Sequence, residues 1–198
     1  MKVGGKVKIT NITKLKVKYK IELENGKSFY ASEDTIIKYG LIKKIDLTND
    51  QLKEIISHES IENAYSKAVH YLQYGLRTTQ DIVDYLTKKE IAPNVINEVI
   101  KKLMEIGYLN DEHYIEAAVM DYFNLNNKGP YWIKRKLQEK DLDNDIIDKY
   151  ISKICTKEAM IEMLYKIIER EFNVRRESKN KKVQKITQKL YTNGFTSD

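Results

Sequence analysis

The sequence of 198 residues contains one cysteine, two prolines and eight glycines. Cys155 has no partner within the chain, so neither an intramolecular disulfide nor a CxxC pair is possible, and a reducing compartment is expected. So few prolines and glycines exclude collagen-like and Pro-rich architectures. No run of about 18 uncharged apolar residues occurs, and no apolar segment follows the charged start. We therefore expect a cytoplasmic protein with no membrane partner.

Motifs for catalysis and for bound cofactors are also missing. His58, His70 and His113 stand far apart, and no HExxH motif or His/Cys cluster has the spacing of metal ligands. Neither a GxxxxGK[ST] loop nor a GxGxxG loop is present. No motif surrounds Cys155, which we interpret as a partly buried, inert thiol. The sequence therefore predicts a protein that is not an enzyme and that needs no metal or cofactor.

The charge of the chain is uneven along its length. There are 35 Lys and Arg residues against 29 Asp and Glu, giving a net charge of +6 and a pI of about 9.1. Residues 1–60 and 157–198 carry the excess of positive charge, and the segment between them is slightly acidic. The densest basic stretch contains Arg170, Arg175, Arg176, Lys179, Lys181, Lys182, Lys185 and Lys189. Its only acidic residues are Glu171 and Glu177.

This basic stretch is the first candidate binding site. On a helix, Lys182, Lys185 and Lys189 share one face beside an apolar stripe, so they can project from a packed element. Such clustered charge binds phosphates by counterion release and without sequence preference, which predicts contact with nucleic acid. An acidic groove of a protein would attract the same lysines, and a solvated charged surface is the alternative without a function.

A second candidate contact with a partner combines aromatic and basic residues. Tyr131 and Trp132 are adjacent, and Lys128, Lys134 and Arg135 lie close to them in the sequence. Aromatic residues and arginine are common anchors of protein interfaces. Burial of Trp132 in the core is the alternative interpretation.

The start of the chain has the pattern of strands. Apolar Val17, Tyr19, Ile21 and Leu23 alternate with Lys16, Lys18, Lys20 and Glu22. This period of two predicts strands with one buried face. Asn25 and Gly26 favour a type I′ hairpin turn, because both residue types accept positive φ angles. We expect a small antiparallel sheet of about three strands, followed by a helix that begins at Ser32.

From about residue 48 onward, apolar residues recur at steps of three and four, the spacing of amphipathic helices. Residues 52–56 predict a short helix and residues 61–72 a longer one. Helix boundaries are marked by Thr78 and Asn110 as N-caps, by Pro93 and Pro130 in first turns, and by Gly107 as a left-handed end. The helix dipole favours acidic residues such as Asp81 and Asp111 in first turns, so we interpret them as structural.

The helical pattern repeats along the chain. A shift of 51 residues places Ile82 on Ile133, Leu86 on Leu137, Ile91 on Leu142 and Val95 on Ile146. A weaker third copy follows 53 residues later, with Ile186, Leu190 and Phe195. Each copy predicts one long helix and two shorter ones. Because the third copy stops before its last helix, we expect the chain to be a shortened version of a longer protein.

These patterns predict a mainly α protein of tandem three-helix repeats in an elongated array, with a small N-terminal antiparallel β element. We expect four segments. They are residues 1–48 with the β element and a short helix, 49–111 with a linker helix and the first repeat, 112–156 with the second repeat, and 157–198 with an incomplete third repeat.

Several short motifs in this order resemble the RecX family of RecA regulators. They include Ala64-x6-Tyr71-Leu72, Arg77-Thr78, Leu86-x-Lys88-Lys89, Gly107-Tyr108-Leu109-Asn110-Asp111 with Tyr114, Lys128-Gly129-Pro130 and Leu137-x2-Lys140. The basic, strand-rich start resembles the N-terminal extension of Firmicute members. The resemblance implies a monomeric, non-enzymatic cytoplasmic protein that binds the RecA filament and DNA, and that restrains strand exchange and ATP hydrolysis in recombination and repair.

The sequence departs from the family pattern at two equivalent places. Members often read Lys-Gly-Ile where this chain has Lys89-Glu90-Ile91 and Lys140-Asp141-Leu142. The missing glycines are expected to alter only the ends of the preceding helices.

Two alternative functions use the same helices. Residues 78–109 also resemble a winged-helix DNA reader. Its second helix, however, would expose as many acidic residues as lysines, and the lysines are Lys101 and Lys102. Such a helix is a poor binder of a DNA groove. A stand-alone DNA-binding protein without sequence preference, acting through the basic C-terminal helix, is the alternative to a RecA regulator.

Overall fold

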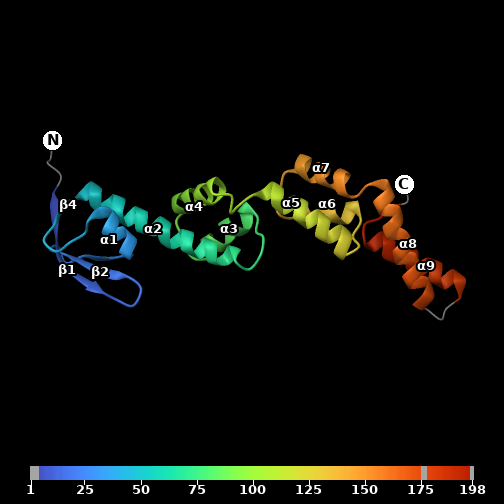
Figure 1. Ribbon diagram of the computed structural model, residues 1–198, viewed down its shortest axis with the longest axis horizontal. Helices are drawn as coiled ribbons and strands as arrows, with labels where there is room; N and C mark the ends of the chain where they lie inside the picture. Colours follow the sequence, from blue (N-terminus) through green and yellow to red (C-terminus); the bar gives the residue numbers. More distant parts are fainter. Residues whose placement is uncertain (1–4, 175–177, 197–198) are drawn as a thin grey trace. The chain divides into compact units, whose positions relative to one another are not determined.

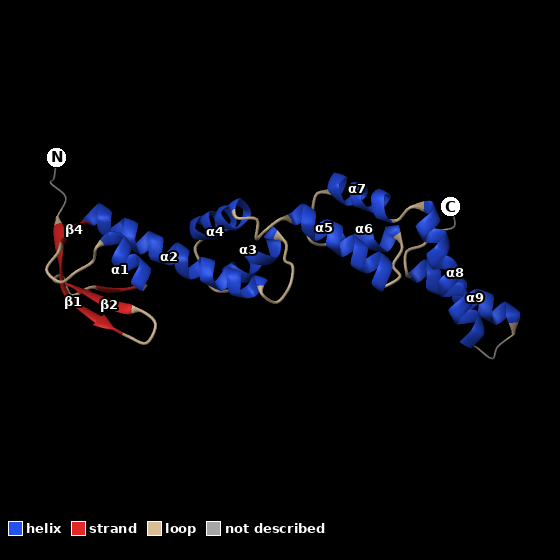
Figure 2. Cartoon of the chain, in the orientation of Figure 1, coloured by secondary structure: helices blue, strands red, loops and turns tan. Residues whose placement is uncertain are grey.

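The structure is a computed structural model that describes residues 5–174 and 178–196. The chain forms two compact units, each with its own core. The first contains Met1–Gly75 and Ile82–Ile106, and the second contains Leu76–Asp81 and Gly107–Asp198. The described part is mainly α-helical, with its strands confined to the first unit (Figure 2). No helix in these described ranges is both long enough and apolar enough to cross a membrane.

The N-terminal sheet has four strands, in the order β3-β2-β1-β4, and every neighbouring pair is antiparallel (Figure 1). Its strands are β1 (Lys6–Lys14), β2 (Tyr19–Leu23), β3 (Ser28–Ala31) and β4 (Asp46–Thr48). The prediction of about three strands was wrong because β4 has only three residues, too few to show an alternating pattern. Helix α1 (Glu33–Tyr39) lies between β3 and β4, and its N-cap Ser32 accepts a hydrogen bond from the Thr35 N–H as predicted.

The turn between β2 and β3 differs from the predicted type I′ turn. Gly26 has a φ of 75°, but Asn25 does not have a positive φ. The Gly26 N–H donates to the Leu23 carbonyl at 3.0 Å, and the Leu23 N–H donates to the Lys27 carbonyl at 2.9 Å. This turn therefore needs only one left-handed residue. The Asn-Gly pair alone does not distinguish such a turn from a type I′ turn, in which both central residues have positive φ angles.

Helix α2 (Asn49–Leu72) is one continuous helix of 24 residues, where the sequence predicts two helices. Thr48 and Gln51 form a capping box at its start. The polar residues between the two apolar stretches include Ser60, whose hydroxyl donates to the Ile56 carbonyl at 2.9 Å. Polar residues lower helix propensity only slightly, and no glycine or proline interrupts the segment, so the helix continues.

The tandem three-helix repeats predicted from the sequence are confirmed. The first repeat uses the end of α2 with α3 (Thr79–Thr87) and α4 (Pro93–Glu105). The second uses α5 (Asp111–Met120), its π-helical extension η1 (Asp121–Leu125), α6 (Pro130–Gln138) and α7 (Asn144–Ile154). Two further helices follow, α8 (Lys157–Val174) and α9 (Lys179–Thr192). A shift of 51 residues places α3 on α6 and the start of α4 on that of α7.

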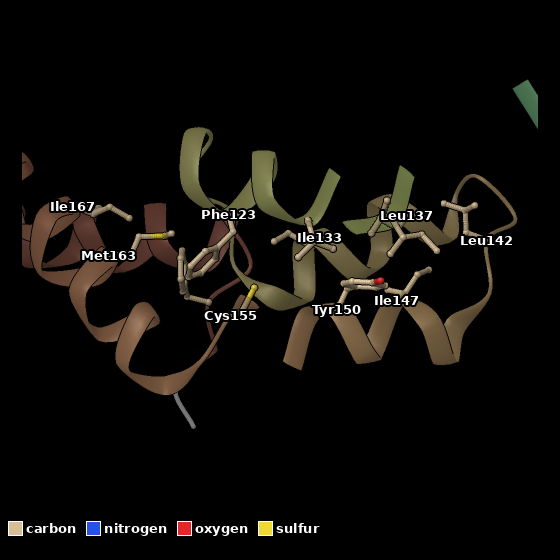
Figure 3. Close-up of a cluster of buried hydrophobic side chains, with 12 residues drawn as sticks. Phe123, Ile133, Leu137, Leu142, Ile147, Tyr150, Cys155, Met163 and Ile167 are labelled. Carbon is tan, nitrogen blue, oxygen red and sulfur yellow. The ribbon is translucent and has the colours of Figure 1, made fainter. Parts of the chain in front are cut away.

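The core of the second unit lies among α5, α6, α7 and the start of α8. Figure 3 shows Phe123 and Ile133 pointing toward the side chains of α7 and α8. Ile133 and Leu142, both predicted from the repeat, are buried. Phe195 of the third copy is buried in the same cluster, which ties the end of the chain to the second repeat.

Two left-handed residues occupy equivalent places in the repeats. Glu90 has a φ of 58° and Asp141 a φ of 55°, and these are the two places where the sequence analysis found a departure from the family pattern. A side chain in this region of φ costs about 1–2 kcal/mol, and only glycine avoids that cost. We therefore expect Glu90→Gly and Asp141→Gly each to raise the free energy of unfolding by about 0.5–1 kcal/mol, measured by urea denaturation.

The matched control is Glu98→Gly, in the middle of α4, where glycine should lower the free energy of unfolding by about 1 kcal/mol. Destabilisation by Asp141→Gly would show that the Asp141 side chain stabilises the turn by more than the backbone strain costs.

Candidate functional site

The predicted basic stretch lies on two helices of the second unit. Helix α8 carries Arg170, and α9 carries Lys179, Lys181, Lys182, Lys185 and Lys189. Arg175 and Arg176 lie outside the described residues. No acidic residue occurs in α9. The charge that the sequence places in one stretch therefore becomes one basic helix packed against α8.

Two of the α9 lysines are directed toward α8. Lys182 Nζ donates to the Phe172 carbonyl at 2.7 Å and lies 4.7 Å from the centroid of the Phe172 ring. Lys189 Nζ binds the Glu171 carboxylate, which also lies 3.9 Å from Arg170 Nη2. The lysine face predicted from the helical spacing is thus partly used to hold α9 against α8.

The other three α9 lysines lie at the surface. Lys179, Lys181 and Lys185 are exposed, whereas Ile186 is buried against the core. A basic helix that is anchored by an apolar residue can present the ammonium groups of Lys179 and Lys181 to a partner. These three lysines form the exposed part of the candidate site.

Lys128 and Trp132, from the second candidate contact, hold the end of the chain. Lys128 Nζ donates to Asn193 Oδ1 at 2.8 Å and lies 4.9 Å from the Trp132 ring centroid. The Gly129 N–H donates to the Asn193 carbonyl at 2.7 Å. Trp132 is half-buried and packs edge-on against Tyr122, with ring centroids 5.1 Å apart. Both predicted contact residues therefore stabilise the fold, and a role in partner binding stays a prediction.

The remaining residues of the second candidate contact lie nearer the solvent. Tyr131 and Arg135 are exposed, and Lys134 Nζ pairs with Asp148 Oδ2 at 2.7 Å. Tyr131 and Lys134 also line a cavity of about 480 Å³ between α6, α7 and α8, where Met160 is among the apolar residues. The structure therefore brings together only part of the predicted cluster, because Lys128 and Trp132 turn toward the chain end.

An ion pair that the sequence analysis missed joins two segments of the second unit. Asp81 accepts two hydrogen bonds from Lys140 Nζ, at 2.9 and 3.0 Å. It also forms a capping box with Thr78, whose hydroxyl accepts from the Asp81 N–H at 3.1 Å. Burial alone would raise the pKa of Asp81, but the hydrogen bonds from Lys140 and Thr78 lower it below its ordinary value. The helix dipole was thus an incomplete explanation for this acidic residue.

Helix α4, the recognition helix of the winged-helix alternative, uses one of its lysines internally. Lys102 Nζ pairs with Glu62 Oε1 of α2 at 2.8 Å and lies 4.2 Å from the Tyr65 ring centroid. Lys101 is exposed. A contact of α4 with DNA would therefore depend mainly on Lys101, which weakens this alternative.

Catalytic or metal-binding chemistry has little to build on in the described ranges. Cys155 is buried, and burial raises the pKa of its thiol to about 11, so the thiol stays protonated at neutral pH. In the same ranges, no group of three or more His, Cys, Asp or Glu residues is arranged to hold a metal ion. The interpretation of Cys155 as an inert thiol agrees with this burial.

Comparison with known protein families identifies both repeats. The model of the first three-helix domain of RecX matches residues 64–103, and that of the second three-helix domain matches residues 110–151. These ranges cover most of the first and second repeats described above, and each ends within the last helix of its repeat. The agreement links the repeat geometry to one family.

Curated relatives match nearly the whole chain. Proteins named Regulatory protein RecX from Lactococcus lactis and Streptococcus uberis are 35% and 31% identical to it, over 196 and 193 residues. The alignments cover 96% and 97% of this chain, and 72% and 74% of those proteins.

Solved structures show the same arrangement. A crystal structure of regulatory protein RecX matches with a TM-score of 0.73 and 30% identity, covering 96% of this chain and 95% of that one. RecX from Lactobacillus salivarius matches with a TM-score of 0.63 and 32% identity, covering 71% of this chain and 92% of that one.

Proposed function

The chain belongs to the RecX family, and from this premise we propose that it binds RecA on its DNA filament and lowers the filament's recombinase and ATPase activity. The names of its relatives describe regulatory proteins. A protein with this activity modulates homologous recombination and DNA repair. It acts as a monomer in the cytoplasm and needs neither a cofactor nor a catalytic group.

The observation that supports this proposal most is the basic helix α9, with Lys179, Lys181 and Lys185 exposed. A helix without acidic residues attracts the phosphates of DNA and any acidic groove of a protein filament. Inhibition then results from steric and electrostatic blocking, and no covalent bond is made or broken.

The test is the DNA-stimulated ATPase activity of a RecA filament, titrated with this protein. We expect hydrolysis to fall as the protein concentration rises, and the effect to weaken as salt is added. Unchanged hydrolysis at low salt would contradict the proposal. If the protein then still shifted bare DNA in a gel, the function would be that of a stand-alone DNA-binding protein.

The exposed lysines of α9 give a sharper variant than the whole basic face. Charge reversal at Lys182 or Lys189 would also break contacts with α8, so a loss of binding could reflect loosening of the helix. Lys179→Gln/Lys181→Gln removes two charges at exposed positions. We expect this variant to lower the slope of log K for DNA against log salt by about 2.

The matched control is Lys43→Gln/Lys53→Gln, which removes two exposed charges from the first unit. It should keep the slope of the unaltered protein. An equal loss of slope in both variants would show that only net charge matters and that α9 is not the binding helix.

A further inference from the structure

The β1–β2 hairpin carries the most regular cationic motif of the first unit. Lys14, Lys16, Lys18 and Lys20 occupy alternate positions, and Leu15, Val17 and Tyr19 lie between them. No acidic residue interrupts the motif. The turn is closed by the Leu15 N–H, which donates to the Lys18 carbonyl at 2.8 Å. The motif therefore spans the turn between β1 and β2, beside the pairing of Tyr19 with Ala31 of β3.

The four lysines have different surroundings. Lys18 Nζ pairs with Glu59 Oε1 at 3.0 Å, and Lys20 Nζ pairs with Glu22 Oε1 at 2.8 Å. Lys14 and Lys16 are exposed, and neither forms an ion pair with a carboxylate in the part of the chain that the structure describes. The hairpin tip therefore keeps the positive charge of these two lysines.

The apolar residues of the tip are exposed as well. Val17 is 85% exposed and Leu15 is 44% exposed. Valine and leucine are among the residue types most often buried in folded proteins. Two ammonium groups therefore flank the largely exposed Val17 and the partly exposed Leu15.

The chemistry of this tip fits duplex DNA. DNA-binding proteins place apolar side chains against bases while lysines bind the phosphates. Protein interfaces, in contrast, are anchored mainly by Trp, Tyr and Arg, and the only such residue of the motif, Tyr19, is half-buried with Lys14 Nζ 5.3 Å from its ring centroid. We propose that the hairpin tip is a second DNA contact of this protein, with Lys14 and Lys16 on phosphates and Val17 in the groove.

This inference rests on the proposed function in one respect, because it gives the N-terminal unit a share of the DNA binding proposed for α9. It is tested on bare DNA without RecA. The hairpin can therefore fail while filament inhibition holds, and the reverse is also possible.

The experiment measures fluorescence anisotropy of a fluorescein-labelled 30-bp duplex titrated with the full chain at several salt concentrations. Each phosphate contact contributes about 0.9 to the slope of log K against log salt. Lys14→Gln/Lys16→Gln should therefore lower the slope by about 2 and weaken low-salt binding by about tenfold. The control Lys43→Gln/Lys53→Gln should leave the slope unchanged, and circular dichroism should show the same melting temperature for all variants.

A second variant separates groove contact from charge. Val17→Ser removes the exposed apolar group but no charge, so it should weaken duplex binding about threefold and keep the salt slope. The proposal would be overturned if the Lys14→Gln/Lys16→Gln variant had the same slope of log K against log salt as the control variant. It would also be overturned if the unaltered protein did not bind the duplex measurably. Loss of ATPase inhibition in that lysine variant with unchanged DNA binding would assign the tip to a protein surface instead, and would also overturn it.

Discussion

Replacing Glu59 by alanine is expected to lower the free energy of unfolding of the first unit by about 3 kcal/mol. Glu59 is only 8% exposed. Its carboxylate accepts from the Ser32 N–H at 2.9 Å, from the Thr35 hydroxyl at 2.8 Å and from Lys18 Nζ at 3.0 Å. The substitution would leave the partly buried Ser32 N–H without this acceptor and take one of its partners from the buried Thr35 hydroxyl. It would also remove the hydrogen bonds that join α1 and the hairpin to α2.

The same carboxylate makes the stability of the first unit depend on pH. Burial alone would raise the pKa of Glu59, but the hydrogen bonds from Ser32, Lys18 and Thr35 lower it below its ordinary value. A lowered pKa in the folded state contributes stability above the unfolded-state pKa of about 4.3, and this contribution is lost as the pH falls through the folded value. The Glu59→Gln variant should therefore be less stable than the unaltered protein at pH 7. Its free energy of unfolding should also decrease less as the pH falls below 4.

Urea denaturation can report on the two units separately. Trp132, the only tryptophan, lies in the second unit, so its fluorescence follows that unit while circular dichroism follows the whole chain. Glu59→Ala should shift only the dichroism transition. The control is Glu54→Ala, which removes an exposed carboxylate that accepts from the Tyr39 hydroxyl, and it should cost less than about 1 kcal/mol. Equal effects of the two substitutions would show that burial of Glu59 does not matter.

Gly194→Ala should lower the free energy of unfolding of the second unit by about 3 kcal/mol. Gly194 has a φ of 84°, and a Cβ there would overlap the backbone nitrogen of Trp132. The turn at Gly194 positions Phe195 in the core and Asn193 against Lys128. A shift of this turn would therefore expose Phe195 and change the Trp132 fluorescence of the folded protein.

Two controls divide this effect into its causes. Gly107→Ala has the same positive φ problem at 74° but open space around the new Cβ, so it should cost about 1–2 kcal/mol. Gly129 has no positive φ, but a Cβ there would overlap the Gly194 carbonyl, so Gly129→Ala tests the close approach alone. If Gly194→Ala cost no more than Gly107→Ala, the contact between this turn and α6 would be looser than the structure shows.

The sequence predicted those parts of the fold that depend on neighbours along the chain. N-caps such as Ser32 and Asn110 satisfy backbone donors three residues away, and the helix end at Gly107 needs only a left-handed residue. The apolar positions of the repeat were predicted because burial on one face imposes a period on the sequence. The errors were local too. Strand β4 is too short for a pattern, and the polar residues between the two predicted helices lower helix propensity too little to interrupt α2.

The sequence predicted which residues make up the candidate site, but not which other residues their side chains contact. Helical spacing placed Lys182 and Lys189 on the basic face, but it could not show that Phe172 and Glu171 on α8 would bind them. The adjacent Tyr131 and Trp132 likewise have different surroundings. Trp132 packs against Tyr122 and Lys128, whereas Tyr131 is exposed.

The sequence by itself determined the repeat, the helix boundaries marked by caps, prolines and Gly107, the family and the basic character of the C-terminal helix. These follow from periodicity, caps and charge, which act over a few residues or are sums over a segment. Only the tertiary structure decided which charges remain available to a partner. The ion pair of Asp81 with Lys140, the burial of Glu59 under Lys18 and the exposure of Lys14 and Lys16 depend on residues that are distant in sequence or on solvent access. Side-chain pairing of this kind is fixed by packing between elements, and no local pattern encodes it.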